Sequence, residues 1–199
     1  SNARKSNSQI RRVRSDINEY LTQGESGIDQ LFLEYRGSIG SSLHYRGYLG
    51  ILEMMYGGAG IEALVEPFGS RLAFGVTLNA LKQREFRKLL GFRGYNVVTG
   101  YLSGYYASPF FNLDLALHVG SYLGGDKGAT FETRRTFDNG YSVGGFFTRT
   151  DVPVQEYGEG GFDKGLFFRI PFNGLLPGNT RGSYSTIIRP LDRDGGRRL

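Results

Sequence analysis

Residues 111–120 read FNLDLALHVG and alternate between apolar side chains and polar or small ones. The apolar row consists of Phe111, Leu113, Leu115, Leu117 and Val119. The opposite row consists of Asn112, Asp114, Ala116, His118 and Gly120. Because successive side chains of a β-strand point to opposite sides, this stretch predicts a strand with one apolar face and one polar face.

The same alternation recurs along the chain. Residues 72–79 read LAFGVTLN, and residues 165–170 read GLFFRI, where Leu166, Phe168 and Ile170 oppose Gly165, Phe167 and Arg169. The segments in which this alternation is less regular are 31–39, 43–51, 60–65, 95–106, 129–137, 141–149 and 183–191. The sequence therefore predicts about ten strands, most of them longer than the average strand.

The segments between these strands contain turn signals and no helical pattern. Asn139-Gly140 predicts a tight hairpin, because both central positions of such a turn favour positive φ. Residues 67–70 and 124–128 read as further turns, and 151–163 as a longer loop. Without helices between the strands, an antiparallel sheet is expected and a parallel α/β sheet is not.

The N-terminal part has a different character. Residues 1–3 (SNA) are interpreted as the remnant of an expression tag, and 4–26 as a helical leader or linker. Ile10, Val13, Ile17 and Leu21 recur at helical spacing, and Gly24 supplies a stop. Residues 27–199 are interpreted as one β-barrel domain.

Composition excludes several classes of protein. The 199 residues include 31 glycines, no cysteine and no tryptophan, with a formal net charge of +5. Without cysteine there is no disulfide framework, thiolate metal site or cysteine nucleophile. The sequence has no apolar run of about 18 residues and no recognised nucleic-acid-binding pattern. Neither a metal nor a cofactor is expected, since the aspartates beside glycines fit turns.

Many consecutive antiparallel strands favour closure, since only a barrel removes both edges of a sheet. We therefore expect an all-β, antiparallel up-and-down barrel of the transmembrane type, preceded by the short helix. In such a barrel the apolar row faces lipid and the polar row faces the lumen. A soluble barrel or sandwich, with the apolar row in an ordinary core, alternates in the same way and stays open as an alternative.

Several motifs point to a known family. They are GFRGYNVVTG (91–100), PFFNLDLAL (109–117), FDNG (137–140), TDVP (150–153), GEGGFDKG (158–165), RPL (189–191) and DGG (194–196). Together, over roughly residues 45–199, they resemble the YjbH-like family of exopolysaccharide-associated outer-membrane proteins. Members of that family are longer, so the chain resembles their C-terminal section.

The resemblance implies a non-enzymatic outer-membrane β-barrel of exopolysaccharide or capsule secretion and biofilm matrix formation. The implied partners are a polysaccharide polymer, outer-membrane lipid and other proteins of the exopolysaccharide operon; nucleic acid is not expected. The family provides no catalytic residues to carry over. Because the chain ends in Arg-Arg-Leu rather than in a strand with an aromatic residue at its end, the tail is expected to lie beyond the last strand.

The candidate lumen residues that would face a polymer are Asn112, Asp114, His118, Arg134 and Arg169. Arginines suit an acidic or hydroxyl-rich polymer through charge-assisted hydrogen bonds. The open alternative is that these arginines pair with Glu132 or Asp114 inside the protein.

Two other functions stay open. One is a soluble periplasmic barrel or sandwich that binds carbohydrate or lipid. The other is an outer-membrane barrel enzyme acting on lipid or glycan, in which His118 would activate a serine such as Ser103 from a neighbouring strand. No nucleophile-elbow pattern supports the enzyme.

Overall fold

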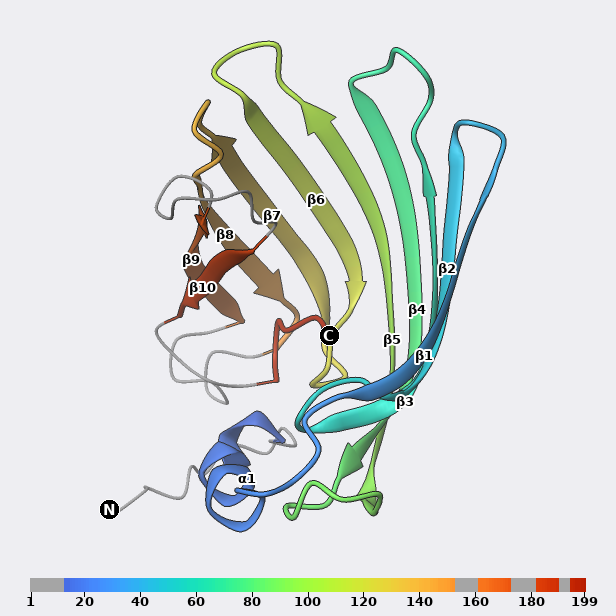
Figure 1. Cartoon of the computed structure of the whole chain (residues 1–199), viewed down its shortest axis with the longest axis vertical. Helices are drawn as coiled ribbons and strands as arrows, with labels where there is room; N and C mark the ends of the chain where they lie inside the picture. Colours follow the sequence, from blue (N-terminus) through green and yellow to red (C-terminus); the bar gives the residue numbers. More distant parts are fainter. Residues whose placement is uncertain (1–12, 153–160, 173–181, 190–193) are drawn as a thin grey trace.

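The structure, a computed structural model, describes residues 13–152, 161–172, 182–189 and 194–199. Ten strands form one sheet in the order β1 to β10, and each pairs antiparallel with its neighbours in the chain (Figure 1). The strands are β1 (Leu31–Ile39), β2 (Leu43–Ile51), β3 (Tyr56–Val65), β4 (Leu72–Arg84), β5 (Phe92–Ala107), β6 (Leu113–Ser121), β7 (Lys127–Thr136), β8 (Ser142–Thr150), β9 (Phe162–Pro171) and β10 (Ser183–Ile188). The predicted all-β class and up-and-down order are confirmed.

The alternation placed most strands correctly, with differences at their ends. The predicted segments 31–39 and 43–51 coincide with β1 and β2. The prediction that Phe111 and Asn112 begin a strand is wrong: their φ angles of 60° and 48° place them in the preceding turn. Of the predicted loop and last strand, residues 153–160 and 190–191 lie outside the described residues.

The predicted hairpin at Asn139-Gly140 is confirmed, but of the two turn positions only Gly140 has a positive φ, and the connection spans residues 137–141. Gly140 has a φ of 82°, which the absence of a Cβ makes accessible. Its N–H donates to the carbonyl of Phe137 at 2.8 Å, and the N–H of Phe137 donates to the carbonyl of Tyr141, also at 2.8 Å. This turn sets the register in which β7 and β8 pair.

The N-terminal helix is short. A 3-10 turn, η1 (Arg14–Asp16), leads into α1 (Ile17–Gln23), and the N–H of Gly24 donates to the carbonyl of Tyr20 at 3.2 Å. Gly24 thus ends the helix as predicted, while residues 1–12, which include the segment interpreted as a tag, lie outside the described residues. None of the helices in the described ranges is long and apolar enough to cross a membrane.

The main apolar cluster lies where α1 meets one end of the sheet (Figure 1). Tyr20 is fully buried, and its hydroxyl donates to the carbonyl of Arg84 at 2.7 Å. Leu52, Met55 and Leu81 pack into the same cluster. The helix therefore packs against the ends of strands β2 to β4. It covers only this end of the sheet (Figure 1).

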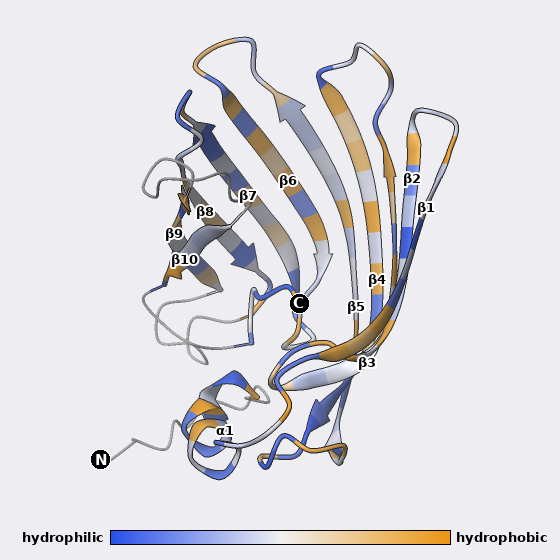
Figure 2. Cartoon of the chain, viewed as in Figure 1, coloured by the Kyte–Doolittle hydropathy of each residue, from blue (hydrophilic) through white to orange (hydrophobic). Residues whose placement is uncertain are grey.

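The two faces of the sheet differ as the alternation predicts. On one face Leu33, Val98 and Leu102 are 73%, 70% and 68% exposed. Leu117 and Val119 of β6 lie on this face, each 49% exposed, whereas His118 between them is buried. Figure 2 shows this alternation of hydropathy along β6. The apolar row is thus directed outward rather than into a dry core.

The sheet curves strongly but has two edges (Figure 1). Among the described residues no hydrogen-bonded ladder joins β1 to β10. The predicted sheet is therefore found as an open, curved sheet, and its closure into a barrel stays a prediction.

Candidate functional site

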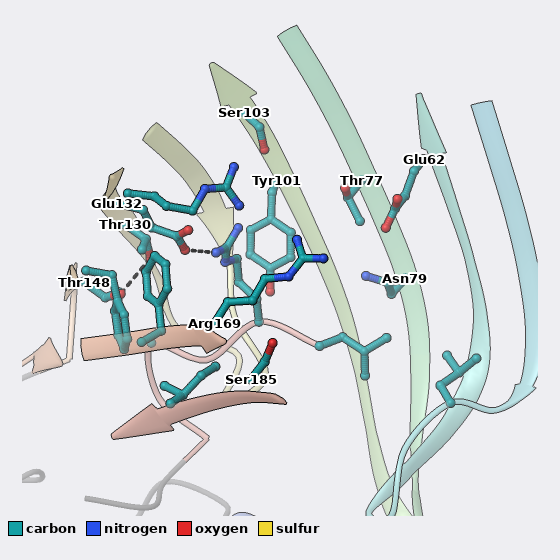
Figure 3. A pocket seen from close by; sticks show the side chains of 18 of the residues that line it. Glu62, Thr77, Asn79, Tyr101, Ser103, Thr130, Glu132, Thr148, Arg169 and Ser185 are labelled. Atoms are coloured by element: carbon teal, nitrogen blue, oxygen red, sulfur yellow. Dashed lines mark hydrogen bonds and ion pairs between the residues drawn. The ribbon is translucent and has the colours of Figure 1, made fainter. Parts of the chain in front are cut away.

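A cavity of about 740 Å³, lined by both polar and apolar side chains, lies on the inner side of the curve, opposite the apolar face. Side chains of β1 to β5 line one part of it, and side chains of β7 to β10 and the C-terminal tail line another. Figure 3 shows Glu62, Thr77 and Asn79 on one side of this space, and Glu132, Thr148 and Arg169 on the other. The cavity is the candidate functional site.

The register of β4 and β5 explains why polar groups gather here. Asn79 lies opposite Thr99, so both side chains project from the same face. The hydroxyl of Tyr48 donates to Oδ1 of Asn79 at 2.6 Å, and Nδ2 of Asn79 donates to Oγ1 of Thr99 at 3.1 Å. Because all three side chains are buried, this network fixes the floor of the cavity.

An ion-pair cluster borders the cavity on β1 to β3. Nη2 of Arg46 lies 2.8 Å from Glu62, and Nη1 lies 3.1 Å from Glu34. The guanidinium carbon also lies 4.9 Å from the centre of the Tyr48 ring. Arg46 is therefore held by two carboxylates and a ring, and its charge is balanced within the protein.

On β5 to β7, His118 lies between a serine and a carboxylate. Its Nδ1 is 2.8 Å from Oγ of Ser103, and its Nε2 is 3.9 Å from Glu132. The same serine–histidine hydrogen bond occurs between Ser38 and the Nδ1 of His44, on exposed parts of β1 and β2. The arrangement thus recurs as a cross-strand contact of this sheet.

The predicted lumen residues divide into three groups. Asp114 and Arg134 lie opposite each other and form an ion pair at 3.3 Å, which is one of the pairings left open. His118 is buried beside the cavity, and Arg169 projects into it. Asn112 precedes β6, where its amide lies 3.5 Å from Asp138. The structure therefore brings Arg134 and Arg169 to the large cavity but leaves Asn112 in a turn.

Sequence reasoning missed Asp194, whose side chain is fully buried. Its Oδ2 accepts the N–H of Val13 and that of Arg14 (2.9 Å), and its Oδ1 accepts the hydroxyl of Tyr56 at 3.1 Å. Burial raises the pKa of Asp194, although these donors and the Arg14 guanidinium favour the charged form. Asp194-Gly195-Gly196 was noted only as one of the family motifs, and no local pattern revealed this contact.

The C-terminal tail, described over residues 194–199, continues along the turn between β6 and β7. The N–H of Gly196 donates to Oδ2 of Asp126 at 2.8 Å, and the N–H of Leu123 donates to the carbonyl of Arg197 at 3.0 Å. Burial raises the pKa of Asp126. The tail lies beyond β10, as expected, and it carries Arg198 into the cavity, where Arg198 pairs with Glu132.

Comparison with known proteins gives two matches. The family model described as "Exopolysaccharide biosynthesis protein YbjH" matches residues 1–199. The uncharacterized lipoprotein YjbH of Escherichia coli (strain K12) is 40% identical over 197 residues, which cover 96% of this chain and 28% of that protein. No solved structure matches the chain.

Proposed function

The chain belongs to the YjbH family of exopolysaccharide biosynthesis proteins, and we propose that its sheet forms part of an outer-membrane barrel wall. In this proposal an exopolysaccharide passes along the polar inner face during secretion and biofilm matrix formation. The protein binds and guides the polymer and performs no chemistry on it.

The observation that carries the proposal is the separation of side chains between the two faces of one sheet. Leu33, Val98 and Leu102 are largely exposed on the outer face, while ion pairs and hydroxyls line the cavity on the inner one. Large exposed apolar patches mark contact with lipid or protein. Apolar-out and polar-in alternation is the pattern of outer-membrane barrels.

Strand length supports the same proposal. A strand of about 9–11 residues, tilted near 45°, crosses the hydrocarbon layer of a bilayer. β4 has 13 residues and β5 has 16, so both are long enough to span the layer and extend beyond it. The E. coli relative is named a lipoprotein, which fits a location at a membrane.

The inner face suits a sugar polymer. Tyr48, Tyr101 and Tyr105 have their rings at the cavity, and Thr77 and Ser185 present hydroxyl groups. Sugars are bound by this combination, because their hydroxyls need partners and their C–H faces pack on rings. Closure requires a partner for the free edges of β1 and β10, either each other or strands of a longer protein; the chain spans 28% of its E. coli relative.

Adjacent residues of β4 provide a test. Leu78 is on the apolar face, and Thr77 lines the cavity. We expect Leu78→Lys to lose membrane integration, because a lysine facing lipid near mid-membrane costs about 2–4 kcal/mol, and Thr77→Lys to keep it. The measurement is the fraction of protein that resists carbonate extraction from outer membranes, together with secreted polymer. A wild-type protein that stays monomeric in water without detergent would overturn the proposal.

A further inference from the structure

The five arginines that line the large cavity are not equivalent. They are Arg46, Arg134, Arg169, Arg189 and Arg198. Four of them form ion pairs: Arg46 with Glu34 and Glu62, Arg134 with Asp114, Arg189 with Asp163, and Arg198 with Glu132. Among the described residues Arg169 has no carboxylate partner, and its one side-chain hydrogen bond is a 3.4 Å contact from Nε to Ser183.

The strand register explains this difference. Arg134 lies directly opposite Asp114, and Arg46 lies directly opposite Glu62. Arg169 instead lies between Ser142 on β8 and Ser185 on β10. Directly opposed residues share a face of the sheet, so both nearest cross-strand neighbours of Arg169 are neutral hydroxyls. Arg169 is exposed, and among the described residues no carboxylate neutralises its charge.

The cavity also offers hydroxyl groups. Tyr101 is almost completely buried, so its hydroxyl is closed off from this space, whereas the hydroxyls of Thr77 and Ser185 line it. Figure 3 shows Arg169 extending from β9 into the space that Tyr101 faces. A cation without a carboxylate partner and hydroxyl groups in one cavity suit a ligand that carries both an acid and hydroxyl groups.

We propose that Arg169, flanked by Ser142 and Ser185, binds a carboxylate or another acidic substituent on a sugar of the secreted polymer. The inference rests on the proposed function and deepens it, since it identifies the polymer as an acidic one. A guanidinium presents two parallel N–H groups that match a carboxylate, and such bonds are stronger than neutral ones. At Arg46 or Arg198 an incoming acid would first have to displace an internal carboxylate, whereas at Arg169 it displaces only water and the weak Ser183 contact.

The test uses the purified chain in detergent and two probes of equal length, an oligogalacturonate and a neutral dextran oligosaccharide. We expect the wild-type protein to bind the acidic probe more tightly, with an affinity that falls as salt is added. Arg169→Gln should weaken binding of the acidic probe about tenfold or more and leave the neutral probe unchanged. Arg169→Lys should recover part of the affinity, because it restores the charge without the planar fork.

Arg149→Gln is the matched control. Arg149 lies on the adjacent strand β8, is exposed and does not line the cavity, so its loss changes the net charge equally. Equal weakening by Arg149→Gln and Arg169→Gln would overturn the inference, because only net charge would then matter. Melting temperatures of all variants should agree with that of the wild type.

The other outcomes separate the two proposals. If both probes bind equally and Arg169→Gln binds as the wild type does, the acidic site is overturned and the polymer role stands. If neither probe binds, both fail. If the phosphates of a lipid such as lipid A bind in an Arg169-dependent way and the oligogalacturonate does not, the anion belongs to the membrane, and the inference is overturned.

Discussion

Asp194 accepts a hydrogen bond from the main-chain N–H of Arg14, a residue 180 positions earlier in the chain, at 2.9 Å. The guanidinium of Arg14 in turn contacts both oxygens of Glu53 at 3.0 Å. This network joins the start of the described chain, the connection between β2 and β3, and the C-terminal tail. The tail is thus fastened next to the N-terminal helix at the same end of the sheet.

We expect Asp194→Asn to loosen the tail. The amide keeps the size of the side chain but loses the charge that faces Arg14, and hydrogen bonds to charged groups contribute about 1.5–3 kcal/mol. Trypsin should then cleave faster after Arg197, whose carbonyl is held by the N–H of Leu123. Mass spectrometry of the C-terminus measures the rate. Asp138→Asn, in an exposed turn, is the control, and equal cleavage in both variants would contradict this role of Asp194.

Close approach of two strands makes Gly120 a sensitive position. A Cβ at Gly120 would collide with the main-chain carbonyl of Gly100 on β5, whereas a Cβ at Gly104 would meet nothing within 4 Å. We expect Gly120→Ala to destabilise the protein by about 1–3 kcal/mol, because the strands must separate. Gly104→Ala should leave the urea midpoint close to that of the wild type. Similar midpoints for the two variants would show that the strands adjust without cost.

Much of the sheet could be predicted because its signals are local. The predicted segments 31–39 and 43–51 coincide with β1 and β2, although their alternation is less regular than that of residues 111–120. β3 was predicted too short, since Gly57 and Gly58 near its start give no apolar signal. β5 begins at Phe92 rather than Tyr95, because Gly94 and Arg93 interrupt the alternation there. Strand faces were therefore predictable, and strand ends were less so.

The pairing of charges in the site could not be predicted. The register of neighbouring strands decides that Asp114 is the partner of Arg134. It also decides that two serines flank Arg169. Register depends on every turn and bulge along the sheet, and the sequence of a single strand does not contain this information. The contact of Asp194 with Arg14 is still less predictable, since it joins the two ends of the chain without any periodic pattern.

The network under the cavity should contribute to stability. Removing the hydroxyl in Tyr48→Phe leaves Oδ1 of the buried Asn79 without the donor that now lies 2.6 Å away. A buried acceptor without a partner costs about 1–3 kcal/mol, so the melting temperature in detergent should fall. Tyr35→Phe, at a largely exposed ring, should change it little. An unchanged melting temperature in Tyr48→Phe would indicate that water replaces the hydroxyl.

The serine–histidine pair on β5 and β6 tests whether the protein is an enzyme. Ser103 is nearly buried and contacts Nδ1 of His118, and the Nε2 of His118 is 3.9 Å from Glu132, longer than a hydrogen bond. The same serine–histidine contact at Ser38 and His44 indicates a structural cross-strand pair. We therefore expect the wild-type protein and Ser103→Ala to hydrolyse a short acyl ester or an acetylated oligosaccharide at the same background rate. Hydrolysis that depends on both Ser103 and His118 would instead favour an enzyme, because nucleophilic catalysis requires the hydroxyl and its base together.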